Sequence, residues 1–147
     1  MEIEPIITPN VNFSDGLIRE DRTGKLTLVG TFHYFNPPRL PFTPPPFFIT
    51  VGLSNFRGKL DRYKVVIRLE EKSSGHVVVS AGGEINSSNV LTPSETIQIP
   101  FQVTGEFPRA GLYAVVVLAE SEHIGSRDLI VNEPKGGSRS APVLYGA

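Results

Sequence analysis

The stretch "LDRYKVVIRLEE" at residues 60–71 decides the fold class, because its side chains alternate with a period of two. The apolar set of this stretch consists of Tyr63, Val65, Ile67 and Leu69. All but one of the residues between them are charged. Such alternation is typical of an antiparallel strand with one face in a core and the other in solvent. The sequence therefore predicts a half-buried β-strand here.

The same pattern recurs on both sides of this stretch, with glycine, proline and serine between the segments. Further strands are expected over residues 11–20, 25–35, 47–54, 76–83, 96–104, 111–121 and 127–132. β-Branched residues outnumber leucine, alanine and methionine, which favours sheet over helix. The sequence therefore predicts an all-β domain over residues 1–132. The last 15 residues, 133–147, have no period and are expected to form a flexible tail.

Two of these segments carry a more specific prediction. Residues 111–121 are apolar on both faces, which is typical of a central strand covered on both sides or at a subunit contact. Pro100 cannot donate a hydrogen bond to a neighbouring strand, so residues 96–104 are expected at a sheet edge or at a bulge. The stretch "EHIGS" at 122–126 is expected to form a turn.

The charged stretch "REDRTGKLTL" at residues 19–28 raises the question of a phosphate-binding loop. That motif requires a glycine five residues before the Gly-Lys pair and a serine or threonine after it. Arg19 and Leu26 occupy these two positions. Gly24 instead suits a turn that needs a positive φ angle, so we expect the tip of a β-hairpin.

Composition excludes several classes of site and partner. The chain has 147 residues, a net charge of −1 and no cysteine. Disulfides, thiolate zinc sites and cysteine nucleophiles are therefore excluded. The balanced charge gives no support for nucleic acid or an anionic membrane as partner. The N-terminal stretch lacks the features of a signal peptide, and no apolar run is long enough for a membrane helix. A cytoplasmic protein without cofactors is expected.

Catalytic and metal-binding motifs are weak. There is no nucleophile elbow and no local metal-ligand spacing, and nothing local pairs His33, His76 or His123 with a serine and a carboxylate. One alternative is a calcium site where acidic residues converge at one end of a sandwich, namely Asp15, Glu20 and Asp21 with Glu120 or Glu122. Neighbouring basic residues favour a solvated mixed-charge surface instead. No metal ligands and no catalytic residues are assigned.

The proline-rich stretch "NPPRLPFTPPP" at residues 36–46 is the least ordinary segment, because six of its eleven residues are proline. Proline favours an extended, stiff backbone that presents side chains at a low cost in entropy. The segment is either a crossover that places Leu40 and Phe42 in the core, or a recognition loop. We predict that Arg39, Leu40 and Phe42 form the binding surface.

Three stretches of the chain resemble a known family. They are "FSDGLIREDRTGKLTLVGTF", "FFITVGLSNFRGKLDRYKVVIRLEE" and "FPRAGLYAVVVLAESEHIGSRDLIV". Together they resemble a bacterial family of small single-domain β-sandwich proteins, a domain of unknown function. The resemblance rests on Asp15, Gly24, Lys25, Phe107, Pro108, Gly111 and Tyr113. It implies a fold and no activity.

The closing "GLY" segment is also similar to the late strand of immunoglobulin-like domains, although the cysteine pair and tryptophan of antibody domains are missing. We therefore expect an immunoglobulin-like β-sandwich of about seven to nine mostly antiparallel strands. The expected function is a non-catalytic binding or assembly module that contacts a protein partner or a second copy of itself. The alternatives are a structural subunit of a larger particle, or a small hydrolase whose residues meet only in three dimensions.

Overall fold

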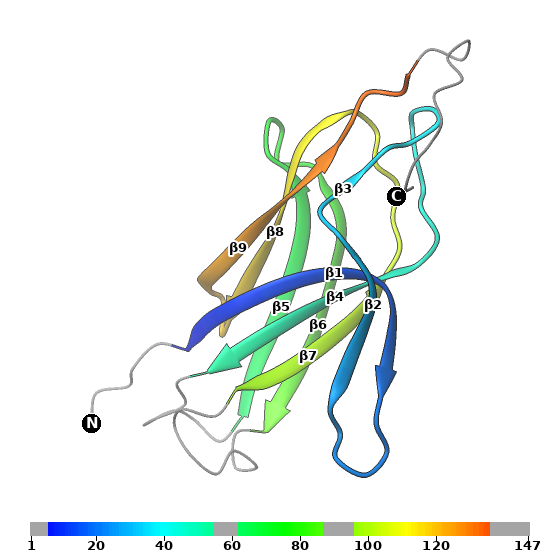
Figure 1. Ribbon diagram of the computed structural model, residues 1–147. Helices are drawn as coiled ribbons and strands as arrows, with labels where there is room; N and C mark the ends of the chain where they lie inside the picture. The colour runs from blue at the N-terminus through cyan, green and yellow to red at the C-terminus, as the bar shows by residue number, and fades with distance from the viewer. Residues whose placement is uncertain (1–5, 55–61, 87–95, 136–147) are drawn as a thin grey trace.

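The computed structural model describes residues 6–54, 62–86 and 96–135, and within them the chain forms nine β-strands and no helix (Figure 1). The strands are β1 (Ile7–Arg19), β2 (Leu26–Phe32), β3 (Tyr34–Phe35), β4 (Phe47–Ser54), β5 (Arg62–Glu71), β6 (Val77–Asn86), β7 (Ile97–Val103), β8 (Gly111–Ala119) and β9 (Glu122–Val131). The prediction of an all-β fold is confirmed. The described residues accordingly contain no helix that could cross a membrane. Residues 136–147 of the expected tail lie outside the described residues.

The strands form two sheets. The first has the order β2-β1-β4-β7 and the second the order β3-β9-β8-β5-β6. All neighbours are antiparallel except β3 and β9, which pair in parallel through Tyr34 with Ile130 and Phe35 with Val131. β7 is an edge strand, as Pro100 predicted, and β8 is the middle strand of its sheet, as its apolar faces predicted.

The described residues form one hydrophobic core, which lies where the inner faces of the two sheets meet. From the first sheet, β4 contributes four almost fully buried side chains at alternate positions, Phe47, Ile49, Val51 and Leu53. From the second sheet, β5 contributes the apolar set predicted from its sequence, Tyr63, Val65, Ile67 and Leu69. Period-two alternation therefore determines which face of each strand is buried.

At one end of the core, aromatic rings close the gap between the sheets. The ring of Phe35 lies 5.5 Å from the rings of Phe42 and Phe47 and 5.4 Å from the ring of Phe107. Phe107 in turn packs edge-on against Tyr113, with 5.0 Å between centroids. Such pairs add about 0.5–1.5 kcal/mol each beyond the area they bury. The aromatic cluster thus joins the proline-rich loop to the connection between β7 and β8.

β1 pairs with two different strands along its length, and it bends between the two pairings (Figure 1). It pairs with β4 from Ile7 to Ser14 and with β2 from Phe13 to Arg19. The second half of β1 and β2 therefore leave β4 and continue as a two-stranded arm, defined here as residues 15–30. Its tip is a turn in which Gly24 has a φ of 71°. The prediction of a hairpin at residues 19–28 is confirmed.

The turn between β8 and β9 differs from the sequence-based expectation. Residues 122–126 were expected to form a turn, but β9 begins at Glu122 and the reversal is made by Glu120 and Ser121. These two residues have φ angles of 50° and 69°, which non-glycine residues seldom adopt. The Glu120 amide donates to the Lys64 carbonyl at 2.9 Å, so tertiary contact with β5 helps to fix this conformation.

Candidate functional site

A groove of about 700 Å³ lies between the arm and the outer face of the first sheet. Its lining residues come from β1, the arm, β4 and the start of β7: Asn10, Asn12, Arg19, Thr23, Gly24, Lys25, Leu26, Leu28, Thr50, Thr96, Ile97 and Gln98. This volume falls in the usual range for small-molecule sites, about 300–1,000 Å³. The bend of β1 creates the groove, because it separates the arm from β4.

The floor of the groove is polar. Gly52 of β4 is paired with Asn10 of β1 on one side and with Gln98 of β7 on the other. A Cβ atom at Gly52 would lie 2.8 Å from Asn10 Oδ1 and 3.0 Å from Gln98 Nε2, so the two amide side chains lean over the glycine. The floor therefore presents two amides, each with donors and an acceptor, at a point where any other residue would fill the space.

Thr50 lies next to these amides and has an unusual hydroxyl. It is paired with Asn12 on one side and with Pro100 on the other, and only 1% of its surface is exposed. Its Oγ1 is buried and has no hydrogen-bond partner among the described residues. A buried hydroxyl without a partner costs free energy, so each such group requires an explanation. Thr50 is also a lining residue of the groove, so this hydroxyl belongs to its floor.

The wall of the groove, formed by the arm, carries two positive charges. Arg19 and Lys25 both line the groove, and its lining residues within 6–54, 62–86 and 96–135 include no aspartate or glutamate. The acidic residue nearest in sequence, Glu20, is held by the tip of the arm. Its Oε2 accepts hydrogen bonds from the hydroxyl of Thr23 at 2.6 Å and from its amide at 2.5 Å. The hydroxyl bond is the main reason that the pKa of Glu20 is lowered.

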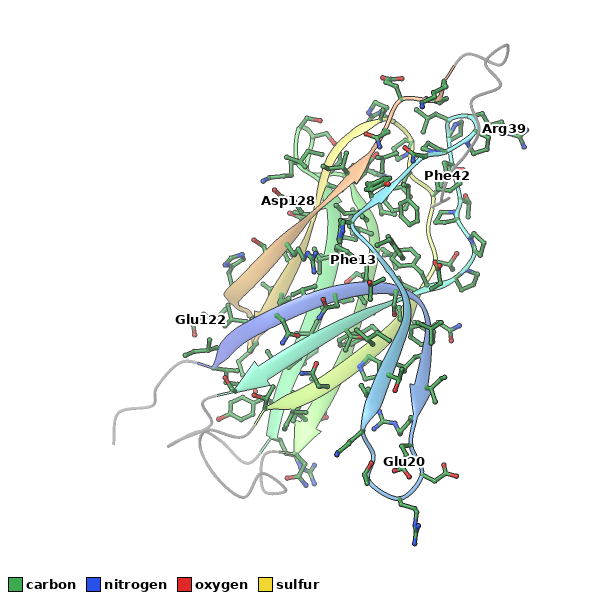
Figure 2. All side chains as sticks on the ribbon, in the orientation of Figure 1. Phe13, Glu20, Arg39, Phe42, Glu122 and Asp128 are labelled. Carbon is green, nitrogen blue, oxygen red and sulfur yellow. The ribbon has the colours of Figure 1, made fainter. Side chains whose placement is uncertain are left out.

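The residues predicted as the binding surface lie elsewhere, in the loop between β3 and β4. Arg39 is exposed, whereas Phe42 is half-buried and packs against the core (Figure 2). Leu40 is also half-buried against the core. Phe42 also pairs with Phe107 through two backbone hydrogen bonds of 2.9 and 2.7 Å. Of the three residues, Arg39 alone is therefore fully available to a partner without rearrangement.

The acidic residues considered for calcium are not brought together. Glu20 lies at the tip of the arm, while Glu122 lies at the start of β9 on another part of the molecule (Figure 2). Within residues 6–54, 62–86 and 96–135, no three histidine, aspartate or glutamate side chains form a group that could hold a metal ion. The imidazoles of His33, His76 and His123 lie on separate segments: His33 between β2 and β3, His76 before β6 and His123 on β9.

One buried carboxylate has a strongly shifted pKa, and it lies outside the groove. Glu71 accepts a bidentate pair of hydrogen bonds from Arg109, at 3.0 and 2.5 Å, and a third from the Ser74 hydroxyl at 2.5 Å. These bonds, those from Arg109 first, lower the pKa of Glu71 from 4.5 to about 2. Both carboxylate oxygens are occupied, so Glu71 joins the β5–β6 turn to the β7–β8 connection and is not available as a general acid.

Comparison with known families agrees with the extent of the fold. A family model described as "Family of unknown function (DUF6941)" matches residues 13–132. The chain belongs to this family. No curated protein matches the chain. The matched region begins within β1 and ends one residue after β9, so the family covers both sheets and most of the groove. Of the lining residues that the structure describes, Asn10 and Asn12 precede the matched region.

Sequence reasoning missed the groove of this family member. The polar floor comes from β1, β4 and β7, which are distant in the sequence and carry no motif. One signal was available: Asn10, Asn12, Thr50 and Gln98 occupy the polar positions of alternating strands. Such positions normally face solvent, so the pattern alone gave no reason to place them in a groove.

Proposed function

We propose that this domain is a non-catalytic binding module and that the groove beside the arm is its ligand site. The observation that carries the proposal is the buried, unpartnered hydroxyl of Thr50 on the groove floor. The amides of Asn10 and Gln98 add donors and acceptors within the same space. Most of the lining residues are polar, and Leu26 and Leu28 add apolar surface on the arm, so a ligand could combine hydrogen bonds with apolar contact.

A fragment library containing neutral, anionic and cationic compounds tests this proposal. Binding is followed by NMR chemical shifts, with Gln98→Trp as the variant that fills the groove. The matched control is Gln102→Trp, because Gln102 is exposed on the same face of β7 and does not line the groove. Fragments should shift the groove residues of the wild type and the control, but not of Gln98→Trp. The absence of fragments with this pattern would overturn the proposal.

Thr50→Val is expected to raise the free energy of unfolding of the unliganded protein by about 1 kcal/mol. The substitution removes a buried hydroxyl that has no partner and keeps the β-branched shape. The same variant is expected to bind groove fragments more weakly. Urea unfolding and NMR titration measure the two effects. A loss of stability on substitution would show that the hydroxyl already has a partner in the folded protein.

The proline-rich loop is a second candidate surface, for contact with a protein partner or a second copy of the chain. Its support is Arg39, which is exposed between exposed prolines at positions 38 and 41. Binding surfaces are enriched in arginine, and a stiff loop loses little entropy on association. This contact would use Arg39 directly, with Leu40 and Phe42 holding the loop in place.

Leu40→Ser combined with Phe42→Ser is expected to lower the free energy of unfolding by about 2–3 kcal/mol, because both side chains are half-buried against the core. Arg39→Ser is expected to leave stability unchanged and to reduce self-association or partner capture. Urea unfolding and analytical ultracentrifugation measure these effects. A double variant as stable as the wild type would mean that both side chains are free to bind.

Support for an immunoglobulin-like architecture comes from the strand order. In immunoglobulin domains, strands G, F, C and C′ form one sheet, and strands A, B and E lie in the other. The orders β9-β8-β5-β6 and β1-β4-β7 match these two sets in chain order. The Tyr113 hydroxyl donates to the Arg109 carbonyl at 2.7 Å, as in the tyrosine corner of such domains. On this assignment, β2 and β3 are additions between strands A and B.

A further inference from the structure

We propose that the ligand of the groove is a small organic anion, an inference that rests on the proposed function. Its anionic group, a carboxylate or a phosphate, would meet Arg19 and Lys25 on the wall formed by the arm. Its apolar body would lie against Leu26 and Leu28. Its remaining polar groups would reach the floor at Thr50 and the neighbouring amides.

The register of the arm places the positive charge and the apolar surface on the same face. Arg19 is paired with Leu26, so their side chains leave the arm on one side. Leu28 lies two residues beyond Leu26 and therefore points the same way. Both leucines are half-buried. The groove wall thus combines a cation with apolar surface, which is the arrangement that an amphipathic anion requires.

The charged groups of Arg19 and Lys25 make few contacts with the rest of the described residues. The guanidinium of Arg19 makes one long hydrogen bond, 3.3 Å from its NH1 to the Gly24 carbonyl. Within the part of the chain that the structure describes, neither Arg19 nor Lys25 forms an ion pair. An arginine has five N–H donors, so most of those of Arg19 are free for a planar carboxylate or a phosphate.

The acidic residue next to Arg19 is not paired with either cation. Glu20 Oε2 accepts hydrogen bonds from the hydroxyl and the amide of Thr23 within the turn, and among the described residues Glu20 forms no ion pair with Arg19 or Lys25. Among the lining residues that the structure describes there is no carboxylate, so the wall formed by the arm is positively charged in a protein whose net charge is −1. A local excess of positive charge in an overall neutral protein favours an anionic ligand over a cationic or neutral one.

Four probes with the same aromatic body separate charge from shape: benzoate, phenyl phosphate, benzyl alcohol and benzylammonium. NMR titration at low ionic strength gives the dissociation constant of each from the groove residues. The two anions are expected to bind at least about tenfold more tightly than the alcohol and the ammonium compound, because hydrogen bonds between charged groups are the stronger ones. The tighter of the two anions identifies the preferred group.

Arg19→Gln combined with Lys25→Gln is expected to weaken binding of both anions about tenfold and to leave the alcohol unchanged. The matched control is Arg22→Gln combined with Lys64→Gln. It removes the same net charge from two exposed residues that do not line the groove. This control should bind as the wild type does. Added salt should weaken the anions in the wild type more than in the Arg19→Gln, Lys25→Gln variant.

Equal binding of anions and alcohol, or anion binding that survives the loss of Arg19 and Lys25, would overturn the anion inference. In either case, if Gln98→Trp abolishes the binding that is observed, the groove is still a ligand site and only its preference for anions is wrong. Probes that bind outside the groove, or none that bind at all, would also overturn the inference. The fragment library then decides separately whether the groove is a ligand site.

Discussion

Replacing Phe107 by alanine is expected to lower the free energy of unfolding by about 3–5 kcal/mol, as is usual for a fully buried phenylalanine. No part of Phe107 is exposed, and its ring touches two others, those of Phe35 and Tyr113. The substitution leaves a cavity where the loop between β3 and β4 meets the core. The backbone hydrogen bonds between Phe107 and Phe42 do not depend on the Phe107 side chain. The decrease in the free energy of unfolding therefore measures side-chain packing.

Phe48→Ala is the matched control for this experiment, because Phe48 is half-buried on the other face of β4. Phe48→Ala is expected to lower the free energy of unfolding by about 1 kcal/mol, because Phe48 buries a smaller apolar area than Phe107 does. Urea unfolding of the two variants and the wild type gives both values. Equal losses would show that the aromatic cluster is no more tightly packed than the outer face of the first sheet.

A second large effect is expected on acidification. The pKa of Glu71 is lowered from 4.5 to about 2, mainly by its hydrogen bonds with Arg109. A carboxyl group whose pKa is lower in the folded protein stabilises that state at pH values above its unfolded pKa. This contribution is therefore fully present at neutral pH. It is lost as the pH falls from about 4.5 towards about 2, where the folded protein must also protonate Glu71.

Glu71→Gln should accordingly melt well below the wild type at pH 7, and the difference in melting temperature should shrink through this acidic window. Glu70→Gln serves as the control, because Glu70 is half-buried on the opposite face of β5 and has a single ion pair, 3.3 Å from Arg68. The control should show a smaller difference in melting temperature at pH 7. A constant difference between wild type and Glu71→Gln at all pH values would contradict the shifted pKa.

The sequence predicted the strands well where alternation was strict. β4 has the expected bounds, residues 47–54, and Pro100 marked β7 as an edge strand. The sequence-based prediction was wrong at the start of β9, where Glu120 and Ser121 make a tight turn without glycine or asparagine. That conformation depends on a contact with Lys64, more than fifty residues earlier in the chain, and local composition carries no signal for such a contact.

The candidate site was harder to predict from the sequence than the strands were. Arg39, Leu40 and Phe42 stood out because proline-rich composition is a local signal. The structure places Leu40 and Phe42 against the core, which was the alternative interpretation of the same residues. The groove depends instead on the bend in β1 and on the pairing of β1 with both β2 and β4. Neither feature is visible before the register of the sheet is known.

The parallel pairing of β3 with β9 has a consequence for synthesis of the chain. Tyr34 and Phe35 pair with Ile130 and Val131, which the ribosome adds almost a hundred residues later. The edge of β3 therefore stays without this partner until nearly the whole described region has been made. Contacts between residues so distant in sequence also slow folding, because the entropy of closing a long loop must be lost first. The proline-rich loop follows β3 directly, so this nascent edge is flanked by residues that cannot extend a sheet.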